Sequence, residues 1–424
     1  MGRKSLDIEK TVMELVMSDD IAKKKQLAKM IFDIAYKEGS YPSSIHEFYM
    51  ARGRGEFGGF TVPAINLRSM TYDLARRIFR VAKRNNSGAF IFEIAKSEVG
   101  YTNQSPIEYS SMVLAAAIKE GYSDPIFIQG DHFQVNAARF RENPDKEIES
   151  LQALIADAIS SGFYNIDIDS STLVDLSKPD LKKQQFLNYE VCAKLTQFIR
   201  RIEPKGITIS VGGEIGEIGH QNSTPEDLRT FMVGLEDRFP KGLVGISKIS
   251  VQTGTTHGGV VLPDGSIAQI KLDFNTLQTL SEIARKEYGL AGAVQHGAST
   301  LPPEAFHKFV ECETAEVHLA TEFQNMIYES RHFPVDLKKK IYEWLKVNAA
   351  SEAKQGETEE QFFYKTRKKS LGPFKKEIMG LPQETRDTIA AEIENKFDLL
   401  FRQLDAVNKR DLVNKYAHAP VKYI

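Results

Sequence analysis

Residues 126–132 have the sequence Ile-Phe-Ile-Gln-Gly-Asp-His, an apolar run that stops at an acid and a histidine. Short apolar runs bounded by turn residues are typical of parallel strands that are buried on both faces. Three later stretches end in the same way, at Glu214, His257 and His296. If these strand ends meet in space, they predict a metal site with an acid/base carboxylate beside it.

The same pattern alternates with helix-like segments through the middle of the chain. Each predicted strand is followed by a predicted helix, and the strands cover residues 60–66, 89–94, 125–131, 163–169, 207–213, 244–252, 289–295 and 314–320. Eight strand/helix units of this length predict an α/β protein with a (β/α)8 or TIM barrel, rather than an open doubly wound sheet.

On both sides of this alternation the sequence pattern changes to polar, helix-like segments without predicted strands. The pattern predicts an N-terminal helical segment over residues 1–50, a catalytic barrel over residues 51–332 and a C-terminal helical appendage over residues 333–424. The appendage carries a basic cluster at residues 365–369, which we interpret as a solvated face rather than a binding patch.

Composition excludes several classes of protein. The 424 residues contain 55 Lys and Arg against 57 Asp and Glu, so the excess of basic residues that nucleic-acid binding needs is missing. The sequence has neither a signal-peptide pattern nor an apolar run long enough to cross a membrane. Its two cysteines, Cys192 and Cys312, predict no disulfide framework. A cytoplasmic protein is therefore expected.

Polar residues lie at the predicted strand ends, where barrel enzymes carry their active sites. These residues are Asn66, Glu93, Asp131 with His132, Asp169, Glu214, His257, His296 and His318. Their concentration at one end of the strands predicts a single site. Asn66 is a candidate substrate contact at the end of the first barrel strand.

Three of these histidines suit a catalytic metal. His132, His257 and His296 would leave one coordination position open, which is the pattern of a catalytic zinc site, although another divalent metal is possible. Asp131 precedes His132 directly and would be placed to move a proton on a bound hydroxyl. The alternative role for Asp131 is to orient His132.

Glycines and hydroxyls accompany the last two of these histidines. Gly258, Gly297, Ser299 and Thr321 are candidate phosphate contacts, because loops after the last strands of a barrel often present N–H groups to a phosphate. The alternative is that the glycines serve ordinary turns.

Five motifs, in order along the chain, resemble the zinc-dependent class II ketose-bisphosphate aldolases of the fructose- and tagatose-bisphosphate type. They are Gly130-Asp-His132, Ile168-Asp-Ser-Ser171, Glu214-Ile-Gly-Glu-Ile-Gly219, Gly254-Thr-Thr-His257-Gly and His296-Gly-Ala-Ser299. Length and the helical tail are also similar, more loosely, to the Z-type subunit of tagatose-bisphosphate aldolase.

The resemblance implies a carbon–carbon lyase of carbohydrate metabolism. Such an enzyme cleaves or condenses a ketose (bis)phosphate through a zinc-stabilised enediolate of dihydroxyacetone phosphate. By this resemblance His132, His257 and His296 hold the zinc, Asp131 exchanges the hydroxyl proton, and Asp169 and Glu214 support the metal. It also implies a homo-oligomer, a dimer or larger, with a sugar phosphate as its small-molecule partner.

Two departures from the family pattern bear on the reaction. The last strand carries His318 where the family has an asparagine, and residues 219–223 lack the carboxylate that serves the family as a mobile proton carrier. His220 or His318 is the candidate to replace that carrier, because imidazole titrates near neutral pH. Two alternatives stay open: a metal-dependent ketose or uronate epimerase on the same site, and a non-catalytic companion subunit of an aldolase.

Overall fold

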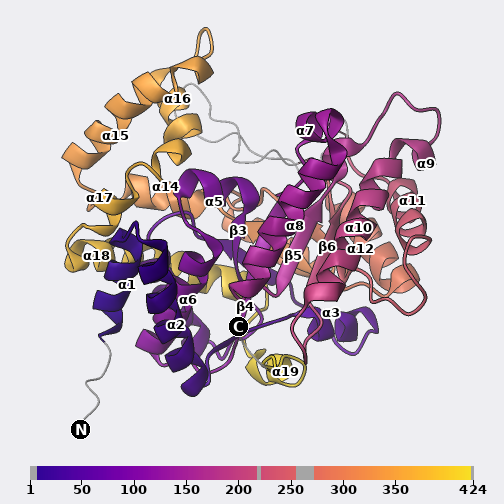
Figure 1. Ribbon diagram of the computed structural model, residues 1–424, viewed down its shortest axis with the longest axis horizontal. Helices are drawn as coiled ribbons and strands as arrows, with labels where there is room; N and C mark the ends of the chain where they lie inside the picture. Colours follow the sequence, from indigo (N-terminus) through magenta and orange to yellow (C-terminus); the bar gives the residue numbers. More distant parts are fainter. Residues whose placement is uncertain (1–6, 217–220, 255–271, 422–424) are drawn as a thin grey trace.

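The computed structural model describes residues 7–216, 221–254 and 272–421. Eight parallel strands form a closed barrel in the order β4-β3-β2-β9-β8-β7-β6-β5, and β5 pairs with β4 to close it. The strands are β2 (Val62–Asn66), β3 (Ile91–Ala95), β4 (Pro125–Gln134), β5 (Asn165–Asp169), β6 (Ser210–Glu214), β7 (Lys248–Val251), β8 (Ala293–Gln295) and β9 (Glu316–Leu319). Each overlaps a predicted strand, and the (β/α)8 fold is confirmed (Figure 1).

Helices follow the strands and cover the outside of the barrel. The longer ones are α4 (Thr71–Arg84), α6 (Pro106–Glu120), α8 (Pro144–Ser160), α10 (Phe186–Ile202), α11 (Pro225–Glu236), α12 (Phe274–Tyr288) and α14 (Thr321–Glu329). Shorter helices in the loops are α5 (Lys96–Thr102), α7 (Ala137–Glu142), α9 (Leu181–Gln184) and α13 (His307–Glu311). Between β8 and β9 the helical segment is short and consists of one 3-10 turn, Pro303–Ala305, and α13.

The N-terminal segment contains a strand that the sequence pattern does not predict. Helices α1 (Ile8–Met17) and α2 (Ile21–Lys37) pack against α6, and β1 (Tyr41–Ser43) then pairs with the start of β4. The side chain of Asn165 accepts a hydrogen bond from the N–H of Ile45 at 2.9 Å and donates to the carbonyl of Ser43. A three-residue strand containing proline has too little apolar alternation to be recognised before its partner is known.

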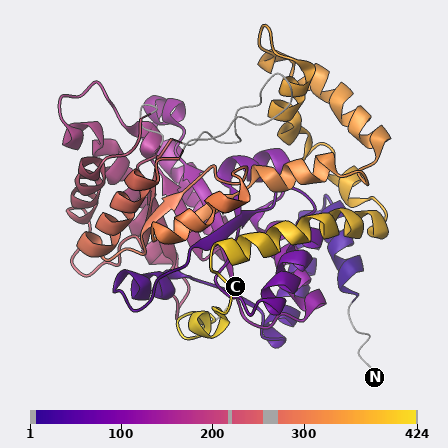
Figure 2. The same cartoon turned by 180° about the vertical axis from the view of Figure 1, so that it is seen from behind.

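The C-terminal segment is helical, as predicted, and returns to the barrel. It contains α15 (Val335–Asn348), α16 (Glu359–Thr366), α17 (Lys375–Met379), α18 (Gln383–Gln403) and α19 (Arg410–Asn414). Helices α15 and α16 project from the body in Figure 1, whereas α18 runs across the back of the molecule in Figure 2 and packs on α4. The division into three parts at residues 50 and 332 stays a prediction.

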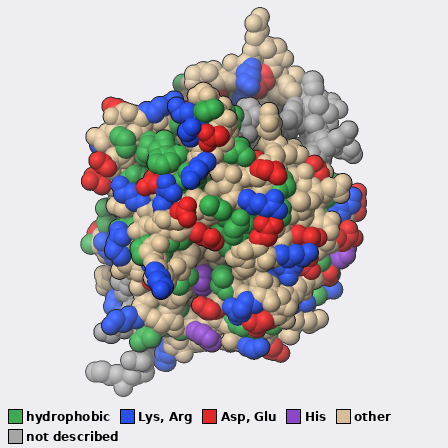
Figure 3. All heavy atoms as spheres, turned by 90° about the vertical axis from the view of Figure 1, so that its right-hand side faces the viewer, with side chains coloured by type: hydrophobic (Ala, Val, Ile, Leu, Met, Phe, Trp, Pro, Cys, Tyr) green, Lys and Arg blue, Asp and Glu red, His purple; other side chains and the backbone are tan. Residues whose placement is uncertain are grey.

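Charges of both signs are interspersed on the face shown in Figure 3, which fits the formal net charge of −2. Of the helices in the described part of the chain, none combines the length and the apolarity of a membrane-crossing segment.

Candidate active site and metal centre

A β-bulge in β4 brings two consecutive side chains to the mouth of the barrel. Gly130 pairs with Ile166 of β5 and Phe133 pairs with Ile168, so the register shifts at Asp131 and His132. His132 has the left-handed backbone angle φ of +41° that a bulge can impose. Neighbouring side chains on a regular strand point to opposite faces, whereas here both line one cavity. The bulge therefore explains how adjacent residues can serve one site.

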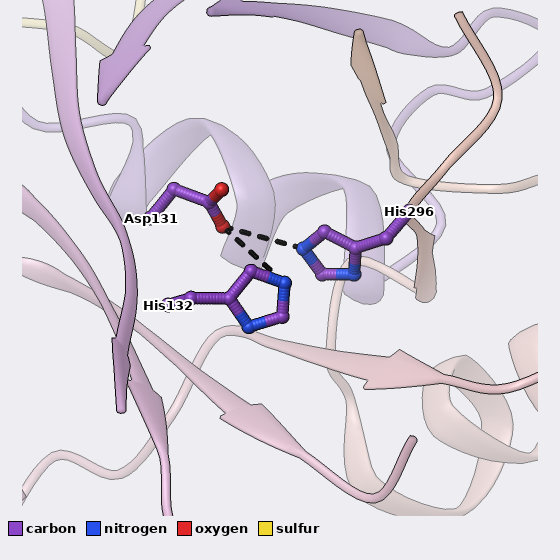
Figure 4. Close-up of side chains that lie close together, drawn as sticks. All are labelled: Asp131, His132 and His296. Carbon is purple, nitrogen blue, oxygen red and sulfur yellow. Dashed lines mark hydrogen bonds and ion pairs between the residues drawn. The ribbon is translucent and has the colours of Figure 1, made fainter. Parts of the chain in front are cut away.

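Asp131 lies between two imidazoles (Figure 4). Its Oδ1 is 3.3 Å from Nε2 of His296 and 3.9 Å from Nε2 of His132. The two imidazole rings have centroids 4.1 Å apart. Strand β4 thus supplies both Asp131 and His132, and the loop after β8 brings His296 to the same carboxylate.

Two more carboxylates lie behind the histidines. Oδ2 of Asp169, at the end of β5, is 3.2 Å from Nδ1 of His132. Oε2 of Glu214, at the end of β6, is 4.0 Å from Nδ1 of His132 and 3.9 Å from Nδ1 of His296. The N–H of Gly216 donates to Oε1 of Glu214 at 2.6 Å, and Ser250 lies 2.8 Å from Nδ1 of His296. These contacts fix the orientation of both rings.

The protonation of the cluster follows from its charges. Burial alone would raise the pKa of Asp131, but the charges of His132 and His318 hold it well below its usual range. Burial would lower the pKa of His132, but Asp131 and Asp169 raise it well above its ordinary value. Burial, and then the charges of His318 and His132, hold the pKa of His296 well below its ordinary value. Burial and the charge of Asp169 raise the pKa of Glu214 to about 8.

This donor set fits a divalent metal. Asp131, His132 and His296 each offer a donor atom within 4.8 Å of the others. Together with Asp169 and Glu214 they place three carboxylates around two imidazoles, an excess of negative charge that protons or a cation must balance. Imidazole nitrogens and carboxylate oxygens are ordinary zinc ligands. His257, the third predicted histidine, lies outside the described residues, as do His220 and Gly258.

His318 is surrounded by acids. Its Nδ1 lies 3.0 Å from Oε2 of Glu93 and 3.2 Å from Oδ1 of Asp131, and its Nε2 lies 2.6 Å from Oε1 of Glu316. Burial opposes a charge on this ring, but Glu93 and Asp131 raise its pKa well above the ordinary value. An imidazolium at this position would place a proton donor directly beside Asp131.

Below His318 the barrel interior holds a buried polar network. Nζ of Lys248 lies 2.6 Å from Oε1 of Glu316, 3.0 Å from Oδ2 of Asp167 and 2.7 Å from Oε1 of Gln129. The side chain of Lys248 is 1% exposed. Sequence reasoning missed Lys248 and Glu316 because they lie at the amino ends of β7 and β9, whereas the search for a site concerned the carboxyl ends of the strands. A lysine inside a strand predicted to be buried on both faces was the available signal.

A cavity of about 400 Å³ opens above this cluster at the carboxyl ends of the strands. The predicted site residues that line it are Asn66, Glu93, Asp131, His132, His296, Gly297, Ser299, His318 and Thr321. Asn66 does not point freely into the cavity, because its amide donates to Oε2 of Glu98 at 2.6 Å. Asp169 and Glu214 lie behind the histidines rather than in the lining. Arg68, Lys96 and Lys368 line the cavity without having been predicted.

Comparisons with solved structures support the fold. A candidate tagatose 6-phosphate kinase from Sinorhizobium meliloti 1021 is 15% identical with a TM-score of 0.56, over 82% of this chain and 97% of that chain. A fructuronate-tagaturonate epimerase from Cohnella laeviribosi is 11% identical with a TM-score of 0.54, over 92% and 85%. A candidate fructose-1,6-biphosphate aldolase from Coccidioides immitis is 18% identical with a TM-score of 0.50, over 86% and 96%. At these identities the likeness concerns the fold alone.

Comparisons of sequence are more specific. No curated protein matches the chain. A family model described as fructose-bisphosphate aldolase class-II matches residues 54–400, which is most of the chain and includes much of its C-terminal helical part. Taken with the barrel and the cluster at its mouth, this match shows that the chain belongs to the class-II fructose-bisphosphate aldolase family.

Proposed function

We propose that this protein is a zinc-dependent aldolase. It would cleave a ketose phosphate, or in reverse condense dihydroxyacetone phosphate with an aldehyde. The observation that supports this proposal most directly is the position of Asp131. Its Oδ1 lies 3.3 Å from Nε2 of His296, and its side chain lines the same cavity as His132. A carboxylate among candidate metal ligands, in a cavity of sugar-phosphate size, is the arrangement that such a cleavage needs.

Asp131 would act as the base. Cleavage begins with loss of the proton from the hydroxyl on the carbon whose bond to its neighbour breaks. Because the pKa of Asp131 is held well below its usual range, the carboxylate is ionised at neutral pH and can accept that proton. In the condensation direction Asp131 would return it.

The metal would be held by His132 and His296, with His257 as the third proposed ligand. Members of the family generally depend on a divalent metal. When bound, zinc supplies a Lewis acid that draws electron density from the substrate carbonyl. Asp169 would orient His132 through their 3.2 Å contact, and the carboxyl group of Glu214 would lie 4.0 Å from the ring of His132 and 3.9 Å from that of His296.

The loops after β8 and β9 would bind the substrate phosphate. Gly297 has a left-handed φ of +71°, which leaves the backbone beside Ser299 tightly turned. Ser299 and Thr321 add hydroxyl donors to the same cavity wall. Gly258 is the fourth proposed contact. Loops at this end of a barrel commonly take a phosphate in this way.

The test combines metal analysis with a panel of ketose phosphates. Wild type should contain about one equivalent of zinc per chain and release triose fragments. Asp131→Ala should lower kcat by about 10²- to 10⁴-fold, the usual contribution of acid–base catalysis. The matched control is Asp145→Ala, because Asp145 is 88% exposed on α8 and should leave kcat unchanged. Full activity in the Asp131 variant would refute the assigned base.

A metal-dependent epimerase is the second candidate. Nδ1 of His318 lies 3.2 Å from Oδ1 of Asp131, so two proton carriers line one cavity. Epimerisation requires that a proton leave a carbon and that a proton return to its opposite face. Asp131 or His318 would serve one face, and the proton for the other face would come from a group outside this pair. Product analysis separates the two reactions. Epimers without triose fragments would exclude the aldolase.

A cytoplasmic location and a homo-oligomer of two or more chains also stay predictions. Light scattering of the purified protein would measure the oligomeric state, and a mass of one chain would contradict the prediction.

A further inference from the structure

The basic cluster at residues 365–369 does not form one solvated face. Lys365 lies 2.6 Å from Glu357, and Lys369 pairs with Glu352, so both of these cations have surface partners. Arg367 is only 3% exposed, and the prediction of a solvated face is therefore wrong for this residue. Each basic residue of the cluster has to be considered separately.

Lys368 differs from its neighbours in both position and partners. It lines the cavity above the histidine cluster. In the described part of the chain, no carboxylate lies within 4.0 Å of its ammonium group, whereas Lys365 and Lys369 each have such a partner. Lys368 is exposed where it lines this cavity, and Arg68 lines the same cavity. Partial burial and then the charge of Arg68 lower the pKa of Lys368, whereas the charge of Glu98 raises it. Lys368 is thus a cation at the active-site cavity, and the carboxylate that favours its charge, Glu98, already pairs with Arg68.

The backbone around Lys368 is held in place on two sides. The 3-10 turn η4 (Arg367–Ser370) is fixed to α14 by the guanidinium of Arg367, which donates to Oδ1 of Asn325 and pairs with Glu329. On the other side the N–H of Gly372 donates to the carbonyl of Tyr101, in α5, at 2.9 Å. Since α14 follows β9 and α5 follows β3, the turn bridges two barrel loops at the mouth.

Arg68 provides a second cation on the same wall. Its Nε lies 2.6 Å from Oε1 of Glu98, and its Nη1 lies 3.5 Å from the hydroxyl of Thr321. Burial opposes the charge, but Glu98 raises the pKa of Arg68, so the guanidinium stays protonated. One carboxylate therefore faces two cations, and Arg68, Glu98 and Lys368 together carry a charge of +1.

We propose that Arg68 and Lys368 bind the phosphate of the substrate that the loops after β8 and β9 contact, with Thr321 and Ser299 as hydroxyl donors. This assignment rests on the proposed function and deepens it, because it makes the C-terminal segment part of the substrate site. A phosphate monoester carries about −1.5 to −2 charge and three strong acceptor oxygens. The planar fork of arginine and the point charge of lysine are the groups that recognise it. A neutral ketose would leave the excess cation uncompensated.

The test measures binding of inorganic phosphate by calorimetry to the zinc-loaded full-length protein. Lys368→Gln should weaken binding about tenfold, because a hydrogen bond to a charged group is lost. Lys369→Gln is the matched control. It removes the same charge from the next residue, whose side chain pairs with Glu352. Its dissociation constant should stay within about twofold of wild type. Equal constants for wild type and Lys368→Gln would overturn the proposal.

Two further measurements test the phosphate assignment: binding of a sugar carboxylate, and the kinetics of the Lys368 variant. Glucuronate, a sugar carboxylate, should bind more weakly than phosphate, and tighter binding that depends on Lys368 would overturn the phosphate assignment. With a ketose phosphate as substrate, Lys368→Gln should raise KM more than it lowers kcat. Phosphate binding needs no turnover. Lysine-dependent phosphate binding without any triose product would therefore reject the proposed aldolase and leave this site standing.

Discussion

Replacing Gly130 by alanine tests whether local packing maintains the bulge that delivers Asp131 and His132. A Cβ at residue 130 would lie 2.5 Å from both Cε1 and Cζ of Phe133. Ordinary contacts between carbon atoms are about 3.5–4.0 Å, so the ring or the strand must move by about 1 Å. Phe133 is completely buried, which leaves its ring no solvent to move into.

The cost should lie in the upper half of the range for overpacked cores. Such substitutions usually destabilise a protein by about 1–3 kcal/mol. Gly130 is paired with Ile94 of β3 on one side and with Ile166 of β5 on the other. The backbone therefore cannot move away from the ring of Phe133. We expect a loss of about 2–3 kcal/mol in the free energy of unfolding. Because the bulge positions both Asp131 and His132, zinc affinity should fall about 10- to 100-fold.

Urea denaturation and zinc titration measure the two effects. Gly100→Ala in α5 is the matched control, because no atom lies within 4 Å of its added Cβ and the residue is exposed. It should be neutral or more stable by up to about 1 kcal/mol. Combining Gly130→Ala with Phe133→Leu should give an interaction energy of about 1 kcal/mol in favour of the pair. A Gly130→Ala protein with wild-type stability and zinc affinity would refute the reasoning.

Three further predictions test the cluster and its support. His296→Ala should lose most of its zinc by elemental analysis, whereas His307→Ala, whose side chain is 50% exposed on α13, should keep it; equal zinc content in both would reject His296 as a ligand. Burial raises the pKa of Glu93 from 4.5 to about 7, so the folded protein binds one extra proton between these values and loses stability as the pH rises through that window. The slope of unfolding free energy should be about 1.4 kcal/mol per pH unit more negative in wild type than in Glu93→Gln, and identical slopes would contradict this assignment. Lys248→Met should cost about 3–5 kcal/mol in urea denaturation, because the fully buried Glu316 and the largely buried Asp167 lose their cation, and a cost below about 1 kcal/mol would show that the network is not held by this charge.

The barrel could be predicted because its signal is local. A parallel strand buried on both faces needs a short apolar run, and eight such runs separated by helical patterns leave few other topologies. The position of the site follows from the same topology. Once the strands are parallel, the residues at their carboxyl ends meet at one face, which is why Asp131, His296 and His318 could be expected near each other.

Other features depend on contacts between distant parts of the chain. The bulge at Asp131 and His132 exists only in the register between β4 and β5, and no local pattern marks it. Lys248 finds Glu316, 68 residues away, only when the barrel closes. These residues begin β7 and β9, so their partners are set by strand register and by closure of the barrel.

The amino-acid pattern by itself therefore determined the barrel, the strand ends and the donor types at the mouth, because each depends on neighbours within a few residues. Tertiary structure alone decided which charges neutralise each other. Lys368 shows this most clearly, since a basic cluster in a helical tail resembles any solvated surface until the fold brings one of its lysines to the cavity. Electrostatic partnership depends on distance in space and on burial, and neither can be read from order along the chain.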